Sequence, residues 1–183
     1  GSDQTAQVNG ENGGADGKLV TETPRNVWKH VVKLYSDRGW KPVVATEREF
    51  YLVAGNEDPA YPLHPPKGRS GRSISGGQSY SIAGINEFDE LIDDIYHFSD
   101  AQGLEIDTLI HEDGAAQLEI NLRHGHPVEL AHQVFLFKRT IREAAMNQNI
   151  YATFLPKPIQ GQPGSAMHSH QSVVELVTGR NVL

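Results

Sequence analysis

Four glutamates stand at spacings that could bind a divalent cation. Glu47 and Glu49 lie two residues apart in a segment rich in Val, Phe and Tyr, and a strand there would project both carboxylates from one face. Glu112 and Glu119 flank a Gly-Ala-Ala turn that could bring two strand ends together. Carboxylate oxygens are the ligands that Mg²⁺ and Mn²⁺ prefer. Either pair alone also fits solvated acids at a strand edge, whereas four together favour a metal site.

Histidines provide a second pattern. His168, His170 and Ser172 alternate in a segment expected to be a strand, so their side chains would share a face. An imidazole there could bind a metal ion, and its neighbours could contact the hydroxyls or phosphates of a ligand. The turn that contains Gly164 would leave backbone N–H groups free to approach an anion. A single histidine on such a strand is more often structural, so the residues alone leave both interpretations open.

Hydrophobic periodicity predicts the elements that must position these side chains. Helical patterns alternate with β-rich segments, and the strands are grouped as neighbours that would pair antiparallel, which is typical of an α+β fold. A loop rich in Pro, Gly, Ser and Arg follows the first strand, and loops of this length are usually functional or disordered. The expected helices cover 24–38, 81 or 86 to 102, and 127–148, and the expected strands cover 41–54, 104–112, 117–122, 150–155 and 165–174.

Composition excludes several classes of protein. The chain has 183 residues, no cysteine and a formal net charge of −7, which rules out disulfide scaffolds, thiol catalysis and cysteine-ligated metals. The acidic balance argues against a nucleic-acid partner, because such binding depends on Lys and Arg. No apolar stretch is long enough to cross a membrane, which predicts a soluble, cytoplasmic protein. Residues 1–22 are expected to be a flexible leader that begins with a cloning scar, Gly1-Ser2.

Three motifs, in this order, resemble those of the glutamine synthetase family. TEREFYL at 46–52 is similar to the family's paired-glutamate strand, and HEDGAAQLEINL at 111–122 is similar to its Glu-(x6)-Glu pair. KPIQGQPGSAMHSHQS at 157–172 resembles its ATP-region signature. The resemblance implies that residues 23–183 are part of an α+β catalytic domain, mostly an antiparallel sheet flanked by helices. The family's N-terminal β-grasp domain and the C-terminal part of its catalytic domain are expected to lie outside this chain.

The resemblance also implies a reaction and the residues that serve it. Two Mg²⁺ or Mn²⁺ ions and ATP are expected, in a full-length parent that is a homo-oligomer. The γ-carboxylate of glutamate would be phosphorylated, and ammonia or an amine would then displace phosphate to give a γ-glutamyl amide. The matched positions are Glu49, Glu112 and Glu119 for the first ion, Glu47 and His168 for the second, His170, Gln171 and Ser172 for ATP, and Gly164 for the substrate glutamate.

Two departures from the family pattern matter. Pro163-Gly164 replaces the usual Asn-Gly and removes an amide that helps to hold glutamate. Such a proline resembles the γ-glutamylpolyamine synthetases, so a polyamine or other amine is favoured over ammonia as the acceptor. The family's phosphate-binding arginines belong to the C-terminal part that is expected to lie outside the chain, so the 183 residues alone are expected to be inactive.

Three alternatives remain. A non-catalytic homologue could act as a binding or structural module, although it would have little reason to keep five metal ligands together. An unrelated metal-dependent hydrolase would bind metal without recognising ATP at residues 164–172. The last alternative is a soluble α+β domain with acidic edges.

Overall fold

The computed structural model of the chain describes residues 10, 11, 13–56 and 58–183. The predicted cloning scar and the first part of the predicted leader lie outside the described residues. The chain forms two compact units. The first combines the described residues up to Pro42 with the C-terminal residues Ser172–Leu183, and the second is Val43–Gln171. Among the described residues, no helix is both long and apolar enough to cross a membrane.

The first unit contains helix α1, Pro24–Ser36, where the sequence predicts a helix. Proline suits the first turn because its missing N–H has no intrahelical partner there and its fixed φ is already helical. Gly39 follows the helix with a φ of +74°, a conformation that favours glycine and ends the helix. In the described part of the predicted leader, Gly13 and Leu19 form an isolated antiparallel bridge.

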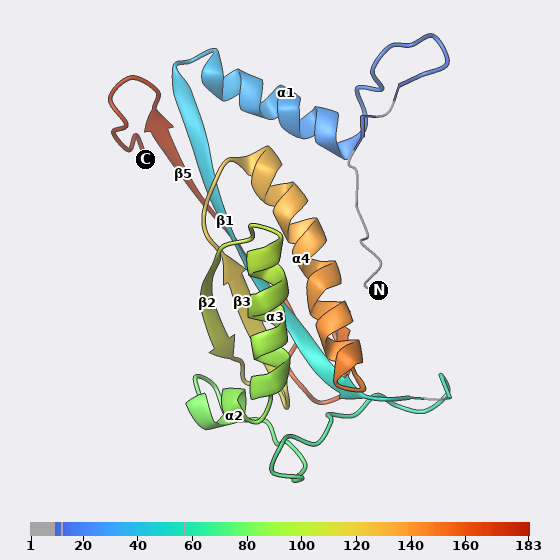
Figure 1. Cartoon of the computed structure of the whole chain (residues 1–183). Coiled ribbons are helices and arrows are strands. Elements are labelled where there is room, and N and C mark those ends of the chain that lie inside the picture. Colours follow the sequence, from blue (N-terminus) through green and yellow to red (C-terminus); the bar gives the residue numbers. More distant parts are fainter. Residues whose placement is uncertain (1–9, 12, 57) are drawn as a thin grey trace. The chain divides into compact units, whose positions relative to one another are not determined.

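A five-stranded sheet carries most of the site residues predicted from the sequence, and Figure 1 shows its strands. Its strands are ordered β2-β3-β1-β4, and β5 pairs with β1 off this path. The pairs β2–β3, β3–β1 and β1–β4 are all antiparallel, which confirms the predicted α+β fold. The strands are β1, Trp40–Ala54; β2, Ile106–His111; β3, Gln117–Leu122; β4, Ile150–Thr153; and β5, Ser169–Glu175.

Three helices follow β1 along the chain: α2, Ile82–Asn86; α3, Asp89–Ala101; and α4, Pro127–Asn147. Helices α3 and α4 lie against one face of the sheet (Figure 1). Of the two starts predicted for the helix that runs to residue 102, the earlier one at Ser81 was wrong, because the chain leaves the helical conformation at Phe88, which has a φ of −128°, and α3 begins only after it. The break accompanies burial of the Phe88 side chain in the core. The Ser81 hydroxyl caps the short α2 by accepting a hydrogen bond from the Gly84 N–H at 3.0 Å.

The last strand also differs from its prediction. The sequence predicts a strand from residue 165, but β5 begins at Ser169. The Ser165 N–H donates to the Pro156 carbonyl at 2.8 Å and closes a loop, and the chain first bonds to the backbone of β1 at Ala166, whose carbonyl accepts from the Glu49 N–H at 3.3 Å. The predicted start was wrong because the Ser165 N–H bonds back to Pro156 and not to a neighbouring strand.

The hydrophobic core lies between the sheet and its helices. Phe50 and Leu52 on β1 are fully buried, and they pack in one cluster with side chains of β3, α3 and α4. Side chains alternate between the two faces of a strand, so Glu47 and Glu49 project from the face of β1 that is turned away from this core. The same strand therefore supplies the core and the candidate site.

The core makes a matched pair of substitutions informative on α4. Phe137 is 1% exposed and packs in the core, whereas Phe135 is 62% exposed. We expect Phe137→Ala to lower the free energy of unfolding by about 3 to 5 kcal/mol, because it removes buried surface and leaves a cavity. Phe135→Ala should change it by less than about 0.5 kcal/mol. Urea unfolding of both variants measures the difference, and equal effects would contradict the assigned face of α4.

Candidate functional site

The four predicted carboxylates converge on one face of the sheet. Glu49 on β1 lies directly opposite Glu119 on β3 in the antiparallel register, and both are buried. The Glu112 N–H donates to the Gln117 carbonyl at 2.9 Å, which holds Glu112 at the end of the β2–β3 hairpin. Like charges placed directly opposite across two strands are destabilising. This arrangement therefore concentrates negative charge at the centre of the sheet face.

The pKa values of Glu112 and Glu119 reflect this concentration of negative charge. Burial, and then the charges of Glu119, Glu49 and Glu47, raise the pKa of Glu112 above its ordinary value. Burial also raises the pKa of Glu119, and the charges of Glu47 and Glu49 add to this effect. Glu47 and Glu49 are thus close enough to oppose the ionisation of both Glu112 and Glu119.

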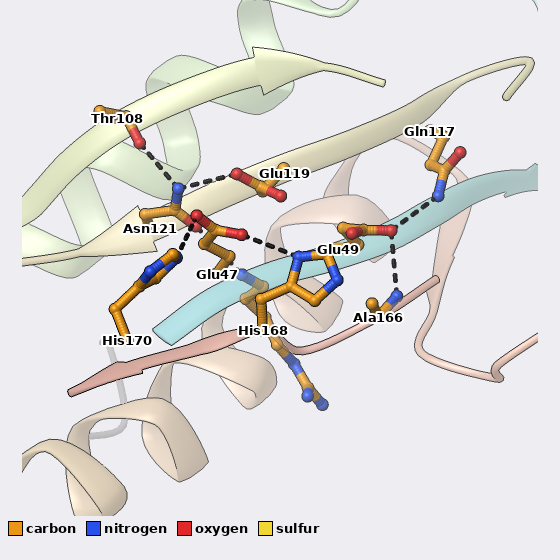
Figure 2. A network of polar contacts seen from close by, with 10 residues as sticks. Glu47, Glu49, Thr108, Gln117, Glu119, Asn121, Ala166, His168 and His170 are labelled. Carbon is orange, nitrogen blue, oxygen red and sulfur yellow. Dashed lines mark hydrogen bonds and ion pairs between the residues drawn. The ribbon is translucent and has the colours of Figure 1, made fainter. Parts of the chain in front are cut away.

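Glu49 is held by two hydrogen-bond donors. Its Oε2 accepts from Gln117 Nε2 at 3.1 Å and from the Ala166 N–H at 3.0 Å (Figure 2). The Gln117 amide also donates to the Gly164 carbonyl at 3.0 Å, and its Oε1 accepts from the Gly114 N–H at 3.0 Å. One buried amide therefore joins the β2–β3 turn, the glutamate strand and the turn before the histidines.

The predicted substrate-binding residue Gly164 lies where the chain passes close to Pro156. A Cβ at this position would lie 2.9 Å from the Pro156 carbonyl oxygen, so the chain passes too closely for a side chain. The preceding Pro163 accepts a hydrogen bond from the Tyr51 hydroxyl at 2.8 Å. Burial, followed by the charges of Glu49 and its neighbours, raises the pKa of Tyr51 to about 12, so the phenol stays a neutral donor at physiological pH.

Glu47 lies between the two predicted histidines. His168 Nδ1 lies 2.9 Å from Glu47 Oε2, and His170 Nε2 lies 2.7 Å from Glu47 Oε1 (Figure 2). The Glu47 N–H also donates to the His168 carbonyl at 3.0 Å, which fixes this segment alongside β1. The hydrogen bond from His170 is the main cause of the lowered pKa of Glu47, and the hydrogen bond to Glu47 raises the pKa of His168.

Sequence reasoning missed two amides that support the carboxylates. Asn121 Nδ2 donates to Glu119 Oε1 at 2.8 Å and to Thr108 Oγ1 at 2.9 Å, and Gln117 holds Glu49 as described above. Both amides lie two residues from Glu119 on β3, one on each side, so the period of a strand places them on the same face. This two-residue spacing from Glu119 was the sequence feature that could have identified both amides.

The predicted ligands are close together but do not form a preassembled metal site. Within the described ranges, no group of three or more His, Asp or Glu side chains is arranged to hold a metal ion. The donor set nevertheless fits a hard dication, because it combines carboxylate oxygens and one imidazole with an excess of negative charge. Of the predicted nucleotide residues, His170 contacts Glu47, Gln171 is exposed at the end of the second unit, and Ser172 belongs to the first unit.

Comparison with known proteins gives a consistent result. The sequence model of the family described as "Glutamine synthetase, catalytic domain" matches residues 21–183. The chain is 35% identical over 171 residues to the gamma-glutamylputrescine synthetase of Escherichia coli K12, covering 92% of the chain and 36% of that protein. It is 32% identical over 158 residues to the glutamine synthetase of Pyrococcus abyssi, covering 86% of the chain and 34% of that protein. The chain thus spans about a third of the length of these relatives.

Solved structures share the fold. One described as a novel glutamine synthase homologue superposes with a TM-score of 0.77 at 21% identity, covering 94% of the chain and 37% of that structure. A structure of GmaS without ligand superposes with a TM-score of 0.75 at 22% identity, covering 91% of the chain and 38% of that structure.

The crowded carboxylates lead to a prediction about stability. Glu119→Gln keeps the shape and the acceptor for Asn121 but removes one charge opposite Glu49, so it should raise the free energy of unfolding at pH 8 by about 1 kcal/mol in metal-free buffer. Because the pKa of Glu119 is raised, the wild-type chain loses stability as pH rises from 4.5, the ordinary glutamate value, through the raised pKa. The stability gained by Glu119→Gln should therefore vanish at acidic pH and be complete above the raised pKa of Glu119.

Urea unfolding between pH 4 and 8 measures this effect. Glu143→Gln is the matched control, because Glu143 is an exposed glutamate on α4 whose ion pair with Arg139 is solvent-exposed and should contribute little. A loss of stability in Glu119→Gln at pH 8, or an equal gain in the control, would show that the carboxylates do not repel one another as the geometry indicates.

Proposed function

This chain belongs to the glutamine synthetase family, and on that premise we propose that it is part of an ATP-dependent ligase that joins glutamate to an amine. The observation that carries the proposal is the convergence of Glu47, Glu49, Glu112 and Glu119 on one sheet face, with His168 in contact with Glu47. A module without catalytic function has no evident need for this costly concentration of charge.

The proposed metal ligands fall into two groups. Glu49, Glu112 and Glu119 would hold one Mg²⁺ or Mn²⁺ ion, and Glu47 and His168 would contribute to a second. When bound, such ions offset the charge of the ATP phosphates and orient the phosphoryl group for transfer to the γ-carboxylate. The hydrogen bonds from Gln117 and Asn121 fix the orientation of the carboxylates, as donors around metal ligands usually do.

Residues on either side of His168 would bind the substrates. We assign His170, Gln171 and Ser172 to the nucleotide, and the backbone around Gly164 to glutamate. The Gly164 turn is well placed for this role, because its carbonyl is tied through Gln117 to Glu49. A substrate held by the turn would therefore be positioned relative to the carboxylates.

The acceptor is proposed to be an amine larger than ammonia. Pro163 stands where ammonia-using enzymes usually carry an asparagine, and the chain is similar to a gamma-glutamylputrescine synthetase. The chain spans about a third of such relatives, so we expect the whole cytoplasmic, homo-oligomeric protein to be active and the 183 residues alone to be inactive.

Metal binding should depend on pH. Ligands must lose their protons to bind a cation, and the pKa values of His168, Glu112 and Glu119 are all raised. Protons should therefore compete with the metal at acidic pH, and the affinity of the chain for Mn²⁺ should rise at least about tenfold between pH 5.5 and 8. Calorimetric titration measures the affinity, with Glu143→Gln behaving as wild type and Glu112→Gln binding more weakly. Affinity that is independent of pH, or unaffected by Glu112→Gln, would count against the site.

The choice of acceptor is tested on the whole protein that carries this chain. Phosphate release with glutamate and ATP should be faster with putrescine or a monoamine than with ammonia, by at least about tenfold in kcat/KM. Glu49→Gln should abolish release with every acceptor. Release with ammonia alone would overturn the proposed acceptor, and undiminished release in Glu49→Gln would overturn the metal assignment.

A further inference from the structure

Three basic side chains meet at one aromatic ring on the core side of β1. The guanidinium carbons of Arg48 and Arg142 lie 4.8 and 5.3 Å from the centroid of the Phe154 ring, and Lys138 Nζ lies 5.2 Å from it. Arg48 belongs to β1, whereas Lys138 and Arg142 lie one turn apart on the same side of α4. We call these four residues the Phe154 basic cluster.

The three cations lack an acidic partner among the described residues. Within the part of the chain that the structure describes, none of the three basic side chains forms an ion pair with Asp or Glu. The buried Nε of Arg48 has no hydrogen-bond partner, and its Nη1 contacts the uncharged sulfur of Met167 at 3.1 Å. Cation–π contacts alone leave this concentration of positive charge without a counterion.

A neighbouring basic residue on α4, Arg139, is by contrast paired with a carboxylate. The guanidinium of Arg139 lies 4.0 Å from the carboxylate of Glu143, one turn further along the helix. Lys138 and Arg142 have the same spacing but carry like charges, which is unfavourable on a helix. Burial and the charge of Arg142 lower the pKa of Arg48, and burial, Arg48 and Arg142 lower that of Lys138.

We propose that the Phe154 basic cluster binds a phosphate group, either inorganic phosphate or the phosphate of a small phosphomonoester. Two guanidinium groups offer paired N–H donors that match phosphate oxygens, and the dianion would neutralise more of the positive charge than one carboxylate could. Arg142 is exposed, so a ligand can reach the cluster from solvent. Arg48 alternates with Glu47 and Glu49 along β1, so this site lies on the opposite sheet face from the proposed metal site.

An NMR titration of the labelled 183-residue chain tests the proposal. Inorganic phosphate and glycerol phosphate are added separately, with sodium chloride holding the ionic strength constant, and the Arg Nε–H signals are followed. The variants are Arg142→Gln and Lys138→Gln, and Arg139→Gln is the control from the same helix. The amide spectrum of each variant reports whether its fold is intact, and Arg142→Gln removes an exposed side chain that the core does not need.

The site predicts a saturable shift of the Arg48 signal in the wild-type chain with at least one probe. Loss of either neighbouring cation should weaken binding at least about tenfold, because each removes a charge-assisted hydrogen bond, whereas Arg139→Gln should stay within about twofold of wild type. The probe that binds more tightly shows whether the site prefers inorganic phosphate or a phosphomonoester. No saturable shift with either probe, or equal weakening in the control, would overturn the proposal.

Discussion

The structure depends on the strict alternation of side chains along β1. Phe50 and Leu52 project into the core, whereas Glu47 and Glu49 project from the other face of the same strand. The antiparallel register with β3 then places Glu119 directly opposite Glu49. A slip of one residue would turn the carboxylates into the core and the apolar side chains out of it. Burial of the core therefore fixes the convergence of the carboxylates, although that convergence is itself unfavourable.

The protein offsets this electrostatic cost with hydrogen-bond donors from distant segments. Glu47 lies between His168 and His170, and Glu49 accepts from the buried amide of Gln117. The compensation is incomplete, because burial, and then the charges of Glu47 and Glu49, still raise the pKa of Glu119. The remaining negative charge is the property that a divalent cation would neutralise in the proposed function. On the opposite face of β1, the Phe154 basic cluster carries an excess of positive charge.

Much of this arrangement could be predicted from local sequence. The period of two along residues 46–52 and 117–122 indicated strands, and the Gly-Ala-Ala turn indicated that the second pair of acids would come together. The break at Phe88 could not be predicted, because it depends on tertiary packing of that side chain rather than on helical periodicity. Local patterns likewise could not show that Gln117 joins three separate segments or that Arg48 meets two side chains of α4. Such contacts depend on register and packing between elements.

The central claim is that the converged carboxylates and His168 are a divalent-cation site. Crystals of the chain grown with millimolar Mn²⁺ and measured at a wavelength where manganese scatters anomalously test it most directly. The proposed function predicts anomalous peaks among Glu49, Glu112 and Glu119 and beside Glu47 and His168. A well-ordered sheet face without a peak at either position, in crystals saturated with Mn²⁺, would contradict it.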